Sequence, residues 1–384
     1  MAVRLRNLWR NIHLWIGVGL TVLFIPLGLT GSYLVFDDAF ERMLHPHRYE
    51  ASAGDTELAP SRYFAAAQAA FGGRAQVAQL RMPQDEGAPA IVTGASGMTA
   101  WIDPASGKVL DAGNPRTELR AVAHQLHENL FMGRSGRRIV GVLGAAMFIS
   151  SLTGLYLWWP RNNAVLKGLR WRRSPIVWSN LHHLVGFWSS LFLAILSLTG
   201  VALAFPELLR GQGAGPPRAE RLKGGPGGPR GPGGPGGRFS FAPPVAAPRM
   251  TADQAVTAAE QATGGSDYAS VRLPTQGGDG AWQVMVLGDN GPAFVAVDDA
   301  TGQAKAMQGR RGGFRGGFGP GFRPRGEGGR GPAMRMVRVL HAGNDASIVW
   351  RLLMFVVGLV PTILGVTGVV FWLKTRRRPF EEAV

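Results

Sequence analysis

The sequence predicts a membrane protein made mainly of α-helices. We expect a four-helix transmembrane bundle that arose by internal duplication, with two small α+β units outside the bilayer. Three observations favour this fold class: long apolar runs, repeated motifs around them, and polar stretches between them. The run at residues 184–205 has no charged residue, and at about 1.5 Å per residue it can cross a hydrocarbon core of about 30 Å. It is therefore expected to be a membrane helix.

Histidines and Thr-Gly pairs recur around the apolar runs at constant offsets. The matching sets are His13 with Thr30-Gly31 and His182 with Thr199-Gly200 for the first and third runs, and His127 with Thr153-Gly154 and His341 with Thr367-Gly368 for the second and fourth. The offset from histidine to threonine is the same within each matched pair of runs. Such repetition predicts two similar halves.

The remaining apolar runs, at residues 14–36, 139–159 and 352–373, are also long enough to span a bilayer. The first exceeds a signal-peptide core and lacks a small-residue cleavage site, so it is expected to stay uncleaved. Arginines at the chain start, together with the basic runs at 161–173 and 374–378, place both termini in the cytoplasm. Three arginines on the outer side, within 134–138, weakly oppose this orientation.

These features divide the chain into seven consecutive segments. They are a first span (1–44), a first small α+β outer unit (45–118), a histidine segment with the second span (119–160), a basic cytoplasmic loop (161–177), the third span (178–206), a second small α+β outer unit (207–336), and a histidine segment with the fourth span and a basic tail (337–384). Two tracts rich in Gly, Pro and Arg, at 211–238 and 309–332, cannot bury a core and are expected to be linkers.

Composition narrows the function classes. The chain of 384 residues has a formal charge of +16, but its arginines concentrate at helix ends and in the Gly/Pro-rich tracts. This distribution favours a lipid bilayer surface, and we expect no nucleic-acid partner. There is no cysteine, which excludes disulfides, iron–sulfur clusters and covalently attached haem. Metal chemistry must therefore use histidine, methionine or carboxylates.

The four repeated histidines are the candidate site. The expected topology places His13 and His182 at the cytoplasmic face, and His127 and His341 at the outer face. Two imidazoles on facing helices can hold a haem iron within a helical bundle, and with both axial positions filled the expected chemistry is electron transfer. The sequence thus predicts two haems per chain. The alternative for any single histidine is an interfacial side chain that only forms hydrogen bonds.

Two neighbouring histidines are less certain candidates. His183 follows His182 directly and points about 100° away from it around a helix, and the repeat favours His182. His124 aligns with an arginine in the second half. It is a candidate for binding a haem propionate or a substrate, or for replacing His127 if the helix is phased differently.

His45 and His47 form a His-Pro-His motif just after the first span. They are candidates for binding substrate iron, although a plain loop explains them more simply. The Thr-Gly pairs suggest no acid–base role. Small residues let helices or a porphyrin approach closely, and threonine can bond to its own helix backbone, so we expect these pairs to serve packing.

Several motifs resemble the PepSY-associated transmembrane family, to which inner-membrane ferric-siderophore reductases belong. They are Ile12-His13 with Gly17, Leu181-His182 with Gly186, Leu126-His127 leading to the run at 152–161, and Leu340-His341 leading to Thr367-Gly368. The resemblance covers all four spans and, more loosely, both outer units. It implies a bacterial inner-membrane protein with b-type haem that reduces a ferric siderophore or other ferric chelate in the periplasm. The long Gly/Pro/Arg tracts depart from the family pattern.

No Gly-x-Gly-x-x-Gly fingerprint for a flavin or nicotinamide follows a predicted strand, so a separate electron donor is expected on the cytoplasmic side or in the membrane. A second hypothesis is a non-enzymatic module, in which the helices only anchor PepSY-like binding or regulatory units. A third is a transporter. Against it, the spans lack carboxylates, and Pro26 and Pro361 do not occupy matching repeat positions.

Overall fold

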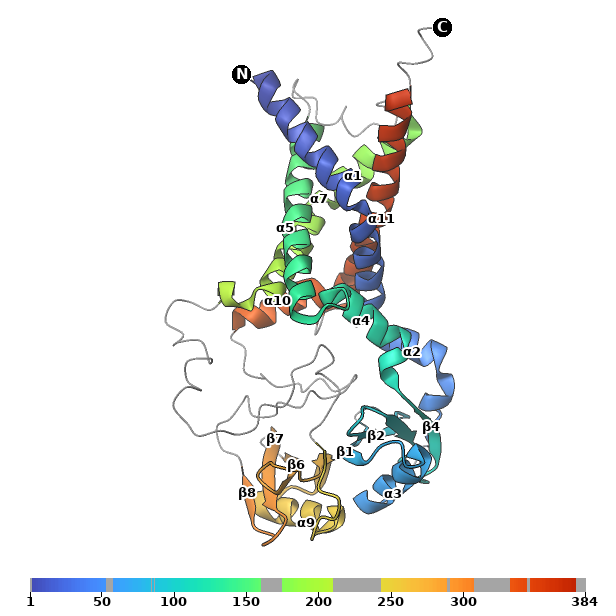
Figure 1. The fold of residues 1–384 in the computed structure, drawn as a ribbon, viewed down its shortest axis with the longest axis vertical. Helices are drawn as coiled ribbons and strands as arrows, with labels where there is room; N and C mark the ends of the chain where they lie inside the picture. Colours follow the sequence, from blue (N-terminus) through green and yellow to red (C-terminus); the bar gives the residue numbers. More distant parts are fainter. Residues whose placement is uncertain are drawn as a thin grey trace. The chain divides into compact units, whose positions relative to one another are not determined.

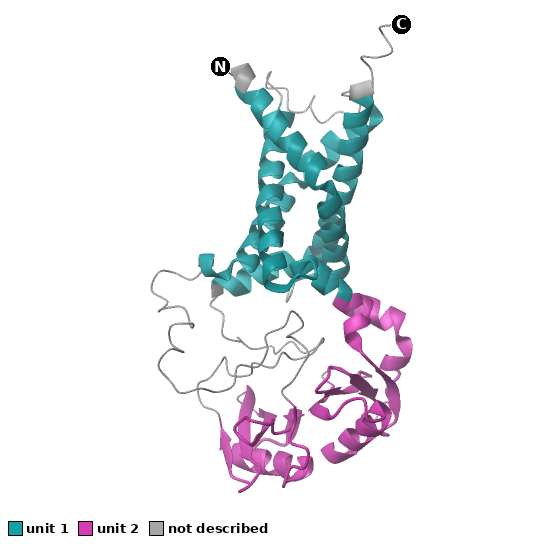
Figure 2. Cartoon of the chain, in the orientation of Figure 1, with its two compact units in different colours: residues 1–37, 122–227, 330–384 teal, residues 38–121, 228–329 magenta. Residues whose placement is uncertain are grey.

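The computed structural model describes residues 2–52, 58–83, 85, 87–159, 175–209, 243–288, 291–306, 332–343 and 346–377. The basic loop predicted at 161–177 lies outside this set up to residue 174, and so do both Gly/Pro/Arg tracts except Pro332. The chain divides into two compact units (Figure 2). The first comprises residues 1–37, 122–227 and 330–384, and the second comprises 38–121 and 228–329.

Four long helices dominate the first unit (Figure 1). They are α1 (Ala2–Val35), α5 (Gly133–Trp158), α7 (Val177–Ala204) and α11 (Ile348–Arg377). Each contains a stretch long and apolar enough to cross a membrane: Leu5–Val35, Gly133–Trp158, Val177–Ala204 and Ile348–Thr375. The chain is therefore a multi-pass helical membrane protein, as the sequence predicted. Helix α1 begins at Ala2, well before the apolar run at 14–36. The segment before this run, which contains the arginines, is therefore part of the same helix.

Small residues let these helices pack closely. Helix α1 packs against α11, and α5 packs against α7. A methyl group added to Gly28 of α1 would lie 2.5 Å from the carbonyl oxygen of Gly358 in α11. Beside it, the hydroxyl of Ser32 donates a hydrogen bond of 2.8 Å to the carbonyl of Phe355. Close backbone approach of this kind is how membrane helices associate without a hydrophobic driving force.

Two shorter helices, α4 (Leu119–Asn129) and α10 (Pro332–Ala342), lie across the end of the bundle at which α1 ends (Figure 1). Both carry a histidine in their last turn, His127 in α4 and His341 in α10. Helix α10 packs against α7. The two short helices therefore bring histidines to the end of the bundle opposite the start of α1.

The second unit is built on one antiparallel sheet with strand order β4-β3-β2-β1-β5-β6-β7-β8. The strands are β1 (Val77–Arg81), β2 (Ala90–Gly94), β3 (Thr99–Ile102), β4 (Val109–Gly113), β5 (Asp267–Arg272), β6 (Ala281–Gly288), β7 (Gly291–Asp298) and β8 (Ala304–Ala306). Its helices are α2 (Asp37–Leu44), α3 (Pro60–Phe71) and α9 (Ala252–Thr263), with short 3₁₀ turns at Pro46–Tyr49 and Pro115–Thr117. A third such turn, Pro206–Leu209, follows α7.

The sequence led us to expect two small outer α+β units, and the strands of these two regions form one continuous sheet. Strands β1 and β5 join them, with Leu80 opposite Val271, and both side chains are fully buried. A four-stranded sheet ending at β1 would leave unpaired backbone groups along that edge, and the pairing with β5 satisfies them.

Helices α3 and α9 share one hydrophobic core with the strands. Tyr63 and Phe71 of α3 and Val256 of α9 are buried in the same cluster as Trp282 of β6. The two helices are also tied together: the amide and hydroxyl of Ser61 donate to the carboxylate of Asp253 at 2.8 and 2.6 Å. The second unit is therefore held together across both halves by its core and not only by the β1–β5 pairing.

Candidate functional site

His13 of α1 and His182 of α7 lie together within the bundle. Their ring centroids are 6.3 Å apart, and the ring planes are inclined by 81°. Two imidazoles bound on opposite sides of one metal ion through bonds of about 2 Å have ring centres about 6 Å apart. The separation therefore fits two ligands of one metal.

The second pair, His127 of α4 and His341 of α10, has nearly the same separation, with ring centroids 6.1 Å apart. Helix α1 relates the two pairs, because it carries His13 near its start and Thr30, which lies beside His127, near its end. At 1.5 Å per residue, these two positions of α1 are about 25 Å apart along the helix axis. The structure thus brings the four predicted histidines together as two pairs near opposite ends of the bundle.

Each of the four histidines lies against a Thr-Gly pair from another helix. The contacts are His13 with Thr153-Gly154, His127 with Thr30-Gly31, His182 with Thr367-Gly368 and His341 with Thr199-Gly200. A methyl group added to any of these glycines would lie 2.7 to 3.2 Å from Cε1 of the facing histidine. Glycine is therefore what allows each ring to rest on the helix.

The hydrogen bonds of the rings fix which nitrogen remains available. Nδ1 of His127 lies 2.9 Å from the carbonyl oxygen of Leu27, and Nδ1 of His341 lies 3.1 Å from that of Leu196. His13 has the same arrangement with Ser150, also at 3.1 Å. Because a carbonyl oxygen can only accept, Nδ1 carries the proton in each ring and Nε2 keeps its lone pair.

Threonine supports the same tautomer. The hydroxyl of Thr367 donates to the carbonyl of Ile363 in its own helix at 2.7 Å, so its oxygen can accept from Nδ1 of His182 at 3.1 Å. Thr30, Thr153 and Thr199 donate to their own helices in the same way. The back-bonding predicted for these threonines is thus present. Their position beside the histidines was missed, although the constant offset from histidine to Thr-Gly was a signal for it.

The donor set of each pair fits a haem iron. Each pair offers two imidazoles whose Nδ1 protons are hydrogen-bonded, which directs Nε2 to a metal and makes it more basic. Haem iron in electron-transfer proteins is commonly held by two such axial ligands. His13 with His182, and His127 with His341, are the residues that would hold it.

The other two histidines of the bundle have different surroundings. His183 lies next to His182 with ring centroids 6.3 Å apart, but His182 is the one that contacts Thr367. His124 lies 3.7 Å from a carboxylate oxygen of Asp37 and 3.5 Å from one of Glu128. Burial alone would lower the pKa of His124, but the nearby carboxylates of Asp37 and Glu128 outweigh it and raise that pKa.

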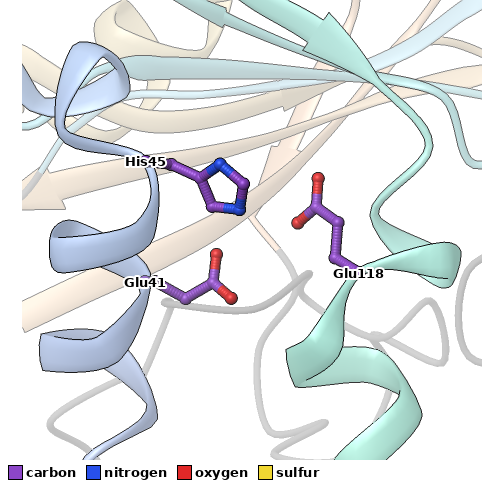
Figure 3. Close-up of side chains that lie close together, drawn as sticks. All are labelled: Glu41, His45 and Glu118. Atoms are coloured by element: carbon purple, nitrogen blue, oxygen red, sulfur yellow. The ribbon is translucent and has the colours of Figure 1, made fainter.

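His45 and His47, which the sequence suggested as a joint iron site, have different partners. Nε2 of His47 lies 3.3 Å from the carboxylate of Asp111. His45 instead faces the carboxylates of Glu41 and Glu118, and one ligand atom from each of these three side chains lies within 4.8 Å of the others (Figure 3). Neither glutamate was singled out from the sequence. Glu118 is far from His45 along the chain, and the spacing of four residues between Glu41 and His45 was the one local signal.

Comparison with known proteins gives one family. The sequence profile of the PepSY-associated TM region matches residues 10–375. No curated protein sequence matches the chain significantly. The matched range includes both histidine pairs, their Thr-Gly partners and all eight strands of the sheet.

Proposed function

Because the chain belongs to the family of the PepSY-associated transmembrane region, we propose that it is a membrane reductase with two b-type haems that carries single electrons to a ferric chelate, such as a ferric siderophore. The observation that carries this proposal is the arrangement of the four histidines as two pairs near opposite ends of one bundle. Haem held by these histidines would change between ferric and ferrous states, which is the chemistry that single-electron transfer requires.

The chain's own residues would hold and orient each group. His13 and His182 supply one pair of ligands, and His127 and His341 supply the other. The carbonyl and threonine partners of Nδ1 keep each ring in one tautomer and one orientation. The glycines facing the rings give each imidazole room, and the apolar spans exclude water from the interior of the bundle.

We further propose that the chain lies in the bacterial inner membrane with both termini in the cytoplasm and the sheet in the periplasm. The two halves would have arisen by duplication, with PepSY-like units that together form the sheet. A separate donor in the cytoplasm or the membrane would supply electrons at the His13/His182 end. One electron passed to the ferric chelate yields ferrous iron, which binds hard oxygen ligands less tightly and is released.

The first test is the haem content of the detergent-purified protein, measured from reduced-minus-oxidised visible spectra and pyridine haemochrome quantitation. We expect two b-type haems per chain, and about one in His13→Ala and in His341→Ala. His183→Ala is the matched control and should keep both. One haem in the wild type would contradict the proposed path between the two ends. No haem after expression with ample haem supply would favour the non-enzymatic, membrane-anchored binding module instead.

The second test is reduction of ferric chelates. The protein is reduced with dithionite, freed of excess reductant, and mixed with a ferric siderophore and a ferrous-specific chromogenic chelator. We expect reoxidation of the haem bands together with formation of the coloured ferrous complex, one ferrous ion per electron. Reoxidation should be much slower in His341→Ala, which lacks the pair at the outer end. Unchanged haem bands in the presence of ferric chelates would contradict the proposed substrate class.

A further inference from the structure

The second unit holds a cluster of metal-ligating side chains that is separate from the histidine pairs. Glu41 is on α2, His45 follows the end of that helix, and Glu118 directly precedes α4. Their side chains point toward one another (Figure 3). The backbone amide of His45 donates to the carbonyl of Glu41 at 2.9 Å, which fixes the two residues one turn apart.

Glu41 has a buried oxygen that no donor among the described residues satisfies. Its side chain is only 6% exposed, and Oε1 is buried without a hydrogen-bond partner in the part of the chain that the structure describes. The other oxygen, Oε2, lies 3.8 Å from the guanidinium of Arg48, which is beyond hydrogen-bond distance. A buried carboxylate oxygen without a partner is costly, and such a group calls for an explanation.

Arg48 cannot provide the missing partner because its donors are directed elsewhere. Nε donates to Asp111 at 2.7 Å, while Nη1 and Nη2 donate to the two oxygens of Glu118 at 3.1 and 2.7 Å. The guanidinium also stacks on the ring of Trp101, 3.7 Å from its centroid. These contacts hold Arg48 in place and leave Oε1 of Glu41 without a donor from its guanidinium.

The charged side chains of the cluster and its surroundings carry a net negative charge. Three carboxylates, those of Glu41, Glu118 and Asp111, surround the single guanidinium of Arg48. The neighbouring Arg120 also acts electrostatically on Glu41, but it is paired with Asp38 at 2.8 Å, and the charges of these two side chains cancel. With the carboxylates ionised, the cluster therefore carries two negative charges in excess, which a divalent cation would neutralise.

We propose that Glu41, His45 and Glu118 bind a divalent first-row transition-metal ion, such as manganese, ferrous iron or zinc. One imidazole and two carboxylates form a donor set that suits these ions. Ligand atoms bound at about 2.1 Å on opposite sides of an ion lie about 4 Å apart, so the present separations of up to 4.8 Å close by small side-chain rotations. Metal binding at this site does not depend on haem. Ferrous ion, the product of the proposed reaction, is one of the divalent ions that the site would bind.

The test uses the full-length protein in detergent, stripped with a chelator and titrated with Mn²⁺. The electron paramagnetic resonance signal of free Mn²⁺ gives the bound fraction, and Zn²⁺ is added as a competitor. We expect one ion per chain, displaced by Zn²⁺. Glu41→Gln and His45→Ala should each weaken binding more than about tenfold, since even outer partners of metal ligands are worth that much.

His183→Ala is the control, because His183 lies on α7 in the other compact unit and its replacement should leave Mn²⁺ binding unchanged. Haem content is measured on every sample, so that loss of the metal with full haem separates this site from the proposed function. If Glu41→Gln does not fold, the Mn²⁺ affinity of His45→Ala alone tests the proposal. Absence of Mn²⁺ binding to the wild type, or equal binding by the wild type and His45→Ala, would overturn the proposal.

Discussion

Gly31 of α1 lies directly beneath the ring of His127: a methyl group at this position would be 2.7 Å from Cε1 of the imidazole. The same ring donates from Nδ1 to the carbonyl of Leu27, one turn earlier in α1. The position and the orientation of His127 therefore depend on α1, although the histidine itself is on α4.

Gly31→Ala should displace His127. The added methyl group would force the ring away from α1, and overpacking of this kind costs about 1–3 kcal/mol. We expect the variant to lose about one of the two proposed haems, with a lower thermal unfolding temperature. Gly19→Ala is the control, because nothing lies within 4 Å of the added group and the backbone becomes less flexible. Full haem content in Gly31→Ala would show that the contact is not needed.

Thr199→Val tests the role of the threonines. It removes the oxygen that lies 3.1 Å from Nδ1 of His341, while the carbonyl of Leu196 remains. The ligand would become less basic, so we expect haem to be retained with a midpoint potential raised by up to about 40 mV, equivalent to about 1 kcal/mol for one electron. Redox titration measures this.

Thr375→Val is the matched control, since Thr375 is exposed and bonds only to carbonyls of its own helix. It should leave both potentials unchanged. Equal potentials in Thr199→Val and the wild type would mean that the threonine serves helix packing alone.

Leu80→Ala tests whether the sheet behaves as one body. Leu80 is fully buried opposite Val271 at the β1–β5 junction, and truncating such a leucine costs about 2–5 kcal/mol. We expect faster amide hydrogen exchange in β2 and β3 and also in β6 and β7, followed by mass spectrometry. Leu287→Ala, at an exposed position of β6, should change little. Faster exchange confined to β1–β4 would show that the two halves unfold independently.

His124 predicts a pH dependence of stability. Its pKa in the folded protein is raised above the ordinary 6.5, because its contacts with Asp37 and Glu128 outweigh burial. The contribution of protonated His124 is therefore fully present below pH 6.5 and is lost as the pH rises through the raised folded value. We expect the thermal unfolding temperature of the wild type to be higher than that of His124→Gln at acidic pH. The difference between the two temperatures should shrink above neutral pH. A difference that grows with pH would contradict this assignment.

The sequence by itself determined the spans and the choice of the four histidines. Apolar runs as long as 184–205 have few alternatives to crossing a bilayer, because their backbone can be satisfied only within a helix. The constant offsets from histidine to Thr-Gly singled out matching positions along the sequence. Histidines at matching positions are expected to come together when the helices that carry them pack symmetrically, which is why the pairing of His13 with His182 could be predicted.

The contacts between segments that are distant in the sequence were decided by the tertiary structure, because local sequence patterns do not encode them. Offsets along the chain do not tell which helix faces which, so the contact of His127 with Gly31 required the packing of α4 on α1. The pairing of β1 with β5 arises because each half leaves a sheet edge that the other can cover. Glu118 meets Glu41 and His45 only because the segment before α4 lies beside α2, and contacts between such distant residues are selected by the energy of the whole fold.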